Sequence, residues 1–149
     1  MVHGDSDTPP WLALARKDIG IREGRDDAKI LAYRAFTKER PWVGTKGPGS
    51  AWCSDAVNAW MERCDIRGTR NAGAASWKTW GRISLAMPGA VIVFGPHDPD
   101  AAGTGHVGLV NRVLADGWVE VISGNCGNSV KLKKYRLADA VAVRWPLLS

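Results

Sequence analysis

The sequence has few cysteines, and their spacing excludes two kinds of small stabilised domain. Only Cys53, Cys64 and Cys126 occur in 149 residues, and none of them forms a Cys-x-x-Cys pair. An odd number at this spacing argues against a disulfide framework and against a structural zinc site. A single bridge among the three stays open at this point. The length allows a core without such staples, and we expect one domain over residues 1–149.

Long apolar runs are also missing. No stretch is long enough to cross a membrane, and residues 1–10 are polar and contain proline, unlike a secretory signal peptide. We therefore expect a soluble monomer that is made in the cytoplasm and does not insert into membranes. If it acts in the periplasm or on the cell wall, another factor must release or secrete it.

Patterns typical of nucleic-acid binding are absent as well. The chain has no helix-turn-helix or zinc-finger spacing, and its basic residues are not interleaved with aromatic ones. The formal net charge is nevertheless +5, which attracts anionic polymers, the bacterial cell wall among them. The densest cationic run, at residues 131–134, is typical of a solvated strand face. We expect no nucleic-acid partner.

What the sequence does contain is a clear order of elements. Apolar residues recur at helical spacing in the first half, where Thr8 is the expected cap of the first helix. The second half changes to strand-like runs with a hairpin signal at residues 116–117. Helices followed by a strand meander predict an α+β fold, with the helices packed on an antiparallel sheet. Helices are expected at 8–20, 27–36, 52–64 and 74–80, and strands at 90–94, 106–114, 118–123, 130–135 and 141–145.

The third expected helix carries the candidate nucleophile. A glycine-rich loop at residues 44–49 precedes it, and Cys53 lies at the N-terminal edge of its apolar face. A helix N-terminus favours a thiolate, and the free backbone N–H groups of its first turn can bind an oxyanion. The alternative is that Cys53 is a small buried core residue. Cys64 reads as core, whereas Cys126 is either exposed or paired.

The candidate base is one of three histidines. His3 lies in the tail and His97 in a loop, where a solvated side chain is the ordinary outcome. His106 begins an apolar strand between two glycines, Gly105 and Gly108, which leave room for close approach. His106 is therefore the expected partner of Cys53.

A third polar group should orient the imidazole. If Ala115 pairs with Trp118 around the hairpin turn, Asn125 lies opposite Gly108 and diagonal to His106, within side-chain reach. Asn125 is the first choice for this role, and Ser123 is the second.

These motifs resemble a known superfamily. Trp-Cys-Ser at 52–54, Gly-His-Val-Gly at 105–108 and Ser-Gly-Asn at 123–125 occur in the order found in NlpC/P60 and CHAP cell-wall hydrolases. Residues 10–16 and 144–146 look like a phage-associated, CHAP-like branch. The resemblance implies a papain-like fold and hydrolysis of a peptidoglycan amide bond, without a cofactor or metal. It also implies that Cys53 is the nucleophile, His106 the general base and Asn125 the polar third member.

Two positions depart from the superfamily's pattern, and one of them is also among three candidates for binding substrate. Trp52 stands where many NlpC/P60 members have aspartate, and Ser123 where CHAP members often have glutamate. Trp52 and Trp77, with the loop at 42–50, are expected to wall the substrate groove. Asp55 is expected to bind a peptide amine, the alternative being a solvated residue of the helix's first turn.

Several functions fit these expectations. The leading hypothesis is a phage endolysin or related lytic factor, an N-acetylmuramoyl-L-alanine amidase or peptide endopeptidase released with the help of a holin. A type VI secretion amidase effector with an immunity protein as partner is an alternative. A non-catalytic cell-wall-binding module, or a cysteine acyltransferase or protease acting on protein, are others.

Overall fold

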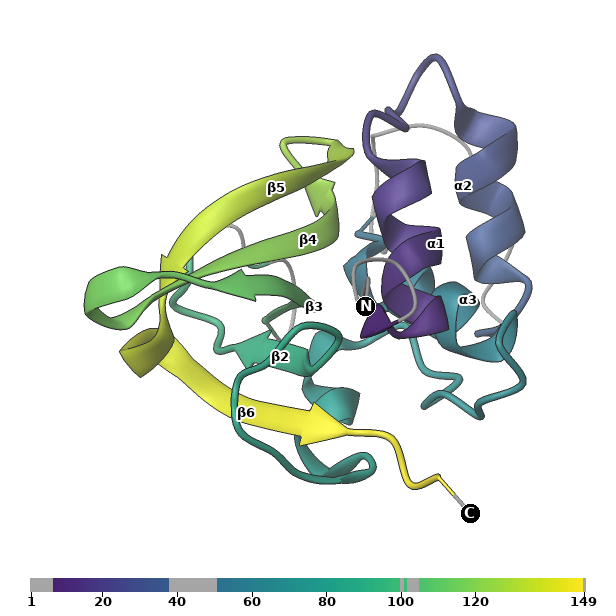
Figure 1. The fold of residues 1–149 in the computed structure, drawn as a ribbon. Helices are drawn as coiled ribbons and strands as arrows, with labels where there is room; N and C mark the ends of the chain where they lie inside the picture. Colours follow the sequence, from purple (N-terminus) through teal and green to yellow (C-terminus); the bar gives the residue numbers. More distant parts are fainter. Residues whose placement is uncertain (1–6, 38–50, 100, 102–104, 149) are drawn as a thin grey trace.

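The computed structural model describes residues 7–37, 51–99, 101 and 105–148. Within them the helices gather on one side and a strongly curved sheet on the other (Figure 1). This arrangement confirms the expected α+β class. The expected glycine-rich loop, its groove wall at 42–50 and the tail with His3 lie outside the described residues.

The helices lie close to where the periodicity places them. They are α1 (Pro10–Asp18), α2 (Asp27–Arg34), α3 (Cys53–Glu62) and the 3-10 helix η2 (Ala74–Thr79). One expectation was wrong: the cap of α1 is Pro9, without a side-chain hydrogen bond. Thr8 instead accepts a hydrogen bond from the Arg16 guanidinium, at 3.4 Å. Proline at the start of a helix needs no cap for its missing N–H group.

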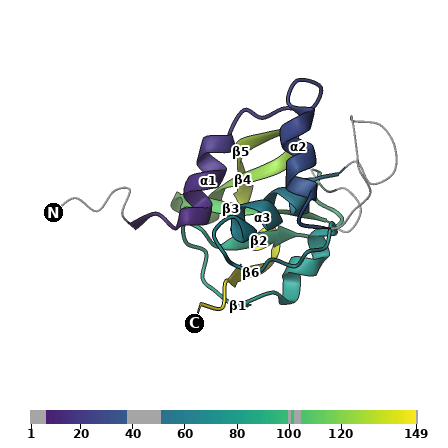
Figure 2. The same ribbon diagram turned by 90° about the vertical axis from the view of Figure 1, so that its right-hand side faces the viewer.

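Helix α3 occupies the middle of the molecule. Every residue from Cys53 to Met61 is buried, including the polar Ser54, Asp55 and Asn58. The sequence predicted a single buried face, but α1 and α2 cover one side of α3 while β3, β4 and η2 surround the rest (Figure 2). Polar side chains on such a helix must therefore find partners inside the protein.

The sheet has six strands in the order β1-β6-β2-β3-β4-β5. Strands β2 to β5 form the predicted antiparallel meander. The last strand departs from it, because β6 returns to pair with β2 and not with β5. The two-residue β1 beside β6 was not predicted, since both of its residues are exposed and show no burial pattern. The bounds are β1 (Arg82–Ile83), β2 (Val91–Phe94), β3 (His106–Val113), β4 (Trp118–Cys126), β5 (Ser129–Arg136) and β6 (Ala140–Trp145).

The two faces of the sheet have separate cores. Alternate residues of β2 to β5 pack under the helices, and the others pack together on the opposite face. The second core includes Phe94, Val121 and Tyr135. None of the three cysteines is bridged, which closes the question that the sequence left open. No described helix has the length and apolar character that crossing a bilayer requires.

The β3–β4 hairpin differs from the expected register. The turn holds three residues, Ala115–Gly117, so Leu114 pairs with Trp118 through a 2.9 Å backbone hydrogen bond. A bulge between Val110 and Arg112 shifts the pairing once more, so that Leu109 lies opposite Ile122. Ser123 is thereby brought beside Gly108, in the place that the two-residue turn would give to Asn125.

Candidate active site

Cys53 is the first residue of α3 and lies against the start of β3. Its side chain is 3% exposed. Burial raises the pKa of the Cys53 thiol to about 11, although backbone N–H groups of Val107, Ser54 and Cys53 itself oppose the rise. The sulfur is thus a neutral thiol at neutral pH, surrounded by N–H donors. Because Val107 follows His106, the thiol lies next to the backbone of the residue that we expect to be the base.

His106 is the first residue of β3, and its side chain is fully buried. Its Nε2 atom lies 2.8 Å from the hydroxyl oxygen of Ser123 on β4. The Tyr135 ring stacks beside the imidazole, with centroids 6.2 Å apart and planes 28° apart. Phe94 also stacks on Tyr135, with ring centroids 4.4 Å apart. The hydrogen bond to Ser123 and the stacked Tyr135 ring therefore restrain the imidazole plane.

Asn125 lies further along β4, past Ser123. It is half-buried and adopts a left-handed backbone conformation, with φ 55°, in an irregular stretch between Ser123 and Cys126. The hydrogen bond at the imidazole Nε2 is made with Ser123. The shifted hairpin register explains why the second choice from sequence occupies this position.

Asp55, Trp77 and Trp52 occupy interior positions that differ from the expected groove wall. All three side chains are fully buried. The Asp55 carboxylate accepts a hydrogen bond from Thr37 at 2.6 Å and lies 3.6 Å from the Arg34 guanidinium. The Trp77 indole donates to the Ser54 hydroxyl at 2.8 Å. These internal partners correct the expectation that the side chains face the substrate.

Trp52 connects α3 to its surroundings. Its indole N–H donates to Glu23 Oε1 at 2.5 Å. Its ring stacks on Tyr33 of α2, with centroids 6.1 Å apart. On the β4 side the ring lies so close to Gly124 that an added Cβ would stand 2.6 Å from it. Sequence reasoning missed Glu23 and Tyr135, since a lone glutamate in a loop and a tyrosine in a strand carry no motif.

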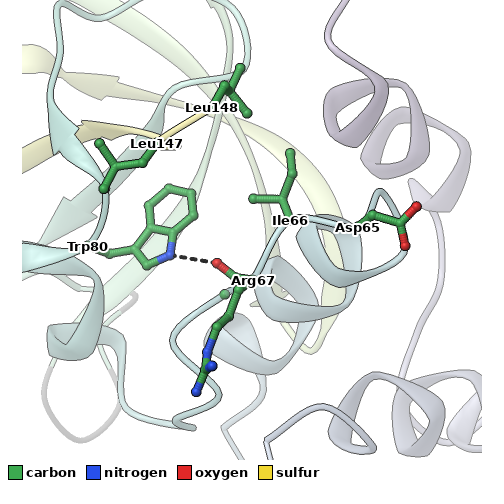
Figure 3. Close-up of a pocket in the computed structure, with 8 residues that line it drawn as sticks. Asp65, Ile66, Arg67, Trp80, Leu147 and Leu148 are labelled. Atoms are coloured by element: carbon green, nitrogen blue, oxygen red, sulfur yellow. Dashed lines mark hydrogen bonds between the residues drawn. The ribbon is translucent and has the colours of Figure 1, made fainter.

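A surface hollow apart from Cys53 and His106 is large enough for a ligand to enter. A hollow of about 460 Å³ lies between the end of α3 and the C-terminal segment, lined by Ile66, Trp80, Leu147 and Leu148 among others (Figure 3). The Trp80 indole donates to the Arg67 carbonyl at 3.0 Å on its wall. The hollow begins beyond Glu62, whereas Cys53 is at the opposite end of the ten-residue helix, about 15 Å away. It is therefore distinct from the candidate active site.

A scan of protein families gives one match, the CHAP domain, over residues 45–125. The chain belongs to the CHAP domain family. This match spans more than half of the sequence and includes Cys53, His106 and Ser123. It confirms the superfamily that the motifs indicate, while the phage-associated branch stays a prediction.

Solved structures confirm the papain-like fold of this CHAP domain. NlpC1 from Trichomonas vaginalis has a TM-score of 0.54 and 18% identity, covering 97% of this chain and 45% of that one. An NlpC/P60 family protein from Bacillus cereus has a TM-score of 0.53 and 15% identity, covering 93% and 40%. The chain thus spans less than half the length of these two proteins. No curated protein matches the chain.

Proposed function

We propose that this CHAP domain is a cysteine hydrolase that cleaves an amide bond of peptidoglycan. The observation that carries the proposal is the position of Cys53: it starts a helix, and its sulfur lies against the backbone N–H of Val107, the residue that follows His106. Membership in the CHAP family supports peptidoglycan as the general substrate.

The geometry supports the following chemistry. Ser123 engages Nε2 of His106, so Nδ1 is the nitrogen that takes the thiol proton as Cys53 attacks the carbonyl carbon. The N–H groups of Cys53, Ser54 and Val107 around the sulfur can stabilise the oxyanion. When the tetrahedral intermediate collapses, the imidazolium protonates the leaving amine and a thioester remains. His106 then deprotonates a water molecule, which hydrolyses the thioester and frees Cys53.

Burial explains why the base is needed. With a pKa of about 11, the thiol of Cys53 is almost entirely protonated at neutral pH. Proton transfer to His106 in the attack itself avoids a free thiolate in the resting enzyme. The role of third group goes to Ser123 in this mechanism, and Asn125 remains a neighbour whose contribution can be measured.

The direct test is digestion of purified peptidoglycan, followed by mass spectrometry of the soluble fragments. We expect the wild-type protein to release fragments whose masses identify the cut bond as the sugar–L-Ala amide or a peptide link. Cys53→Ala should abolish release, and His106→Ala should lower it by about 10²- to 10⁴-fold. Uncut peptidoglycan with folded protein would contradict the proposal, and a Cys53→Ala variant that keeps its activity would replace it with a non-catalytic binding module.

We further propose a lytic role, as a phage endolysin or related factor. An enzyme of this kind harms a bacterium only on the side of the membrane where peptidoglycan lies. Expression in the cytoplasm should be harmless, and expression with an added export leader should lyse or arrest the cells. Cys53→Ala with the same leader is the matched control. Equal growth of exported wild type and exported Cys53→Ala would count against this role.

A further inference from the structure

Glu23 is a buried acid that the proposed chemistry does not use. It lies in the segment between α1 and α2, and its side chain is only 8% exposed. One carboxylate oxygen accepts the Trp52 indole N–H, and the other is buried without a hydrogen-bond partner in the part of the chain that the structure describes. Burial raises the pKa of this carboxyl, and the nearby Asp27 carboxylate adds to the rise. Such an arrangement costs folding free energy, so stability alone does not explain it.

Trp52 lies between the two halves of the candidate site. It precedes Cys53 and caps α3, where its carbonyl accepts the Ala56 N–H at 3.0 Å. Its ring meets the backbone of Gly124, which follows the Ser123 that holds His106. The ring is therefore the spacer between the helix that carries the thiol and the strand that holds the imidazole.

Glu23 is placed to fix the orientation of that spacer. Its backbone N–H donates to the Asn128 carbonyl at 2.9 Å, which ties it to the turn between β4 and β5. Its carboxylate then reaches the only polar atom of the indole. Without this acceptor, stacking on Tyr33 and contact with Gly124 still hold the ring plane, but no other hydrogen bond among the described residues holds its N–H edge.

We propose that Glu23 and Trp52 are positioning residues that set the separation between Cys53 and the His106–Ser123 pair. The proposal rests on the proposed function for its catalytic meaning. A displacement of about 1 Å between reacting groups is enough to cost a large factor in rate. The pair therefore acts on turnover and on thiol reactivity, and much less on folding or on substrate affinity.

The test compares four variants: Glu23→Leu, Glu23→Gln, Trp52→Phe and the double variant Glu23→Leu/Trp52→Phe. Glu23→Leu removes the acceptor and should lower kcat about tenfold with KM within twofold. Glu23→Gln keeps an amide oxygen for the indole and should stay within threefold of wild type. Trp52→Phe removes the donor together with the part of the indole that meets Gly124, so it should be at least as slow as Glu23→Leu, and the double variant should be no slower than the slower single variant.

Two further measurements separate positioning from a merely structural role. The urea midpoint of Glu23→Leu should stay near that of wild type, because removal of a buried carboxylate offsets the lost hydrogen bond. The alkylation rate of Cys53 by iodoacetamide at pH 7, followed on the Cys53 peptide by mass spectrometry, should fall severalfold. Glu62→Leu replaces a partly buried glutamate at the other end of α3 and should keep the wild-type kcat and alkylation rate.

An unchanged kcat and alkylation rate in Glu23→Leu would overturn the proposal. So would a loss of kcat that only follows the loss of folded protein, or losses in the two single variants that add up in the double variant. If Glu23→Leu does not fold, the comparison of Glu23→Gln with Trp52→Phe decides: equal alkylation rates overturn the proposal and unequal ones support it. Alkylation needs no substrate. If peptidoglycan stays intact while Glu23→Leu still slows alkylation, the proposed function fails and the positioning stands.

Discussion

At the scale of single residues, the decisive contact is the 2.8 Å hydrogen bond between Ser123 and Nε2 of His106. A serine hydroxyl holds an imidazole by one hydrogen bond and carries no charge. It restrains the ring plane but contributes less to stabilising an imidazolium than a carboxylate would. The stacked Tyr135 supplies a second constraint on the same ring. Orientation, more than charge, is what the neighbours of His106 provide.

This view makes Ser123 and Asn125 separable by mutation. Ser123→Ala should lower kcat by about 10- to 100-fold, a part of the factor that general-base catalysis contributes, because the imidazole loses its partner. Ser123→Thr keeps the hydroxyl and should restore most of the loss. Asn125→Gly suits the left-handed backbone at φ 55° and should change kcat by less than threefold. The reverse order of effects would return the third role to Asn125.

The buried thiol also predicts a pH dependence of stability. The pKa of Cys53 rises from 9.0 to about 11 in the folded protein, so folding favours the protonated thiol. This contribution is fully present below pH 9 and is lost as the pH rises through about 11, on the order of 2–3 kcal/mol at most. Urea unfolding of wild type and Cys53→Ala between pH 8 and 11.5 measures it. The stability difference between the two should shift against wild type over this window, whereas parallel curves would contradict the burial argument.

At the scale of elements, the site depends on how closely α3 approaches β4. Gly124 is the contact point, since an added Cβ would lie 2.6 and 2.7 Å from two Trp52 ring atoms and 3.0 Å from Ala56. The Trp52 ring is fully buried, so any shift of the ring has to displace neighbouring side chains. The helix and the strand are therefore held at a separation that only glycine permits.

Gly124→Ala should force these two elements apart. We expect a loss of about 1–3 kcal/mol in the free energy of unfolding from overpacking, together with a lower kcat. Gly95→Ala is the matched control, because its Cβ would make only an ordinary 3.5 Å contact with Val141. Urea unfolding and turnover on the same peptidoglycan fragment measure both effects. Wild-type kcat in Gly124→Ala would mean that the separation of α3 and β4 does not govern turnover.

The sequence predicted the helices and the position of the hairpin turn well. Helical periodicity predicted the bounds of α1, α2 and α3 to within a few residues, and Asp116–Gly117 correctly predicted the position of the β3–β4 turn. The register could not be predicted, because both residues adopt left-handed conformations in a three-residue turn and β3 carries a bulge at Asn111 before the turn. The turn is one residue longer than expected, and the bulge shifts the pairing by one more residue. Together they place Ser123, and not Asn125, beside His106.

The burial of side chains around α3 could not be predicted from the sequence either. Asp55 lies in the first turn of a helix and Trp77 is an aromatic residue expected near the site. Both features suggest contact with a ligand. Their partners, Thr37 and Arg34 for Asp55 and Ser54 for Trp77, come from distant parts of the chain or from an unexpected face of the helix. Pattern reasoning sees the neighbours of a residue along the chain but not those across the core.

At the scale of the whole molecule, the net charge of +5 is spread over several elements. The cations of β5 do not form an isolated patch, because Glu120 lies opposite Lys134 and Asp139 lines the same hollow as Lys133 and Arg136. Attraction to the anionic wall should therefore follow the total charge more than any one strand. This expectation separates wall binding from the chemistry at Cys53.

Ionic strength and paired charge variants test that expectation. Binding of inactive Cys53→Ala to purified sacculi should fall about tenfold between 50 and 500 mM NaCl, while wild-type turnover on a small soluble fragment changes less than twofold. Neutralising Lys131, Lys134 and Arg136 lowers the charge from +5 to +2, and so does neutralising the exposed Lys29, Lys78 and Arg82. The two triple variants should weaken sacculus binding equally, because screening acts on the summed field. A loss confined to the first variant would show instead that β5 itself is the wall-binding surface.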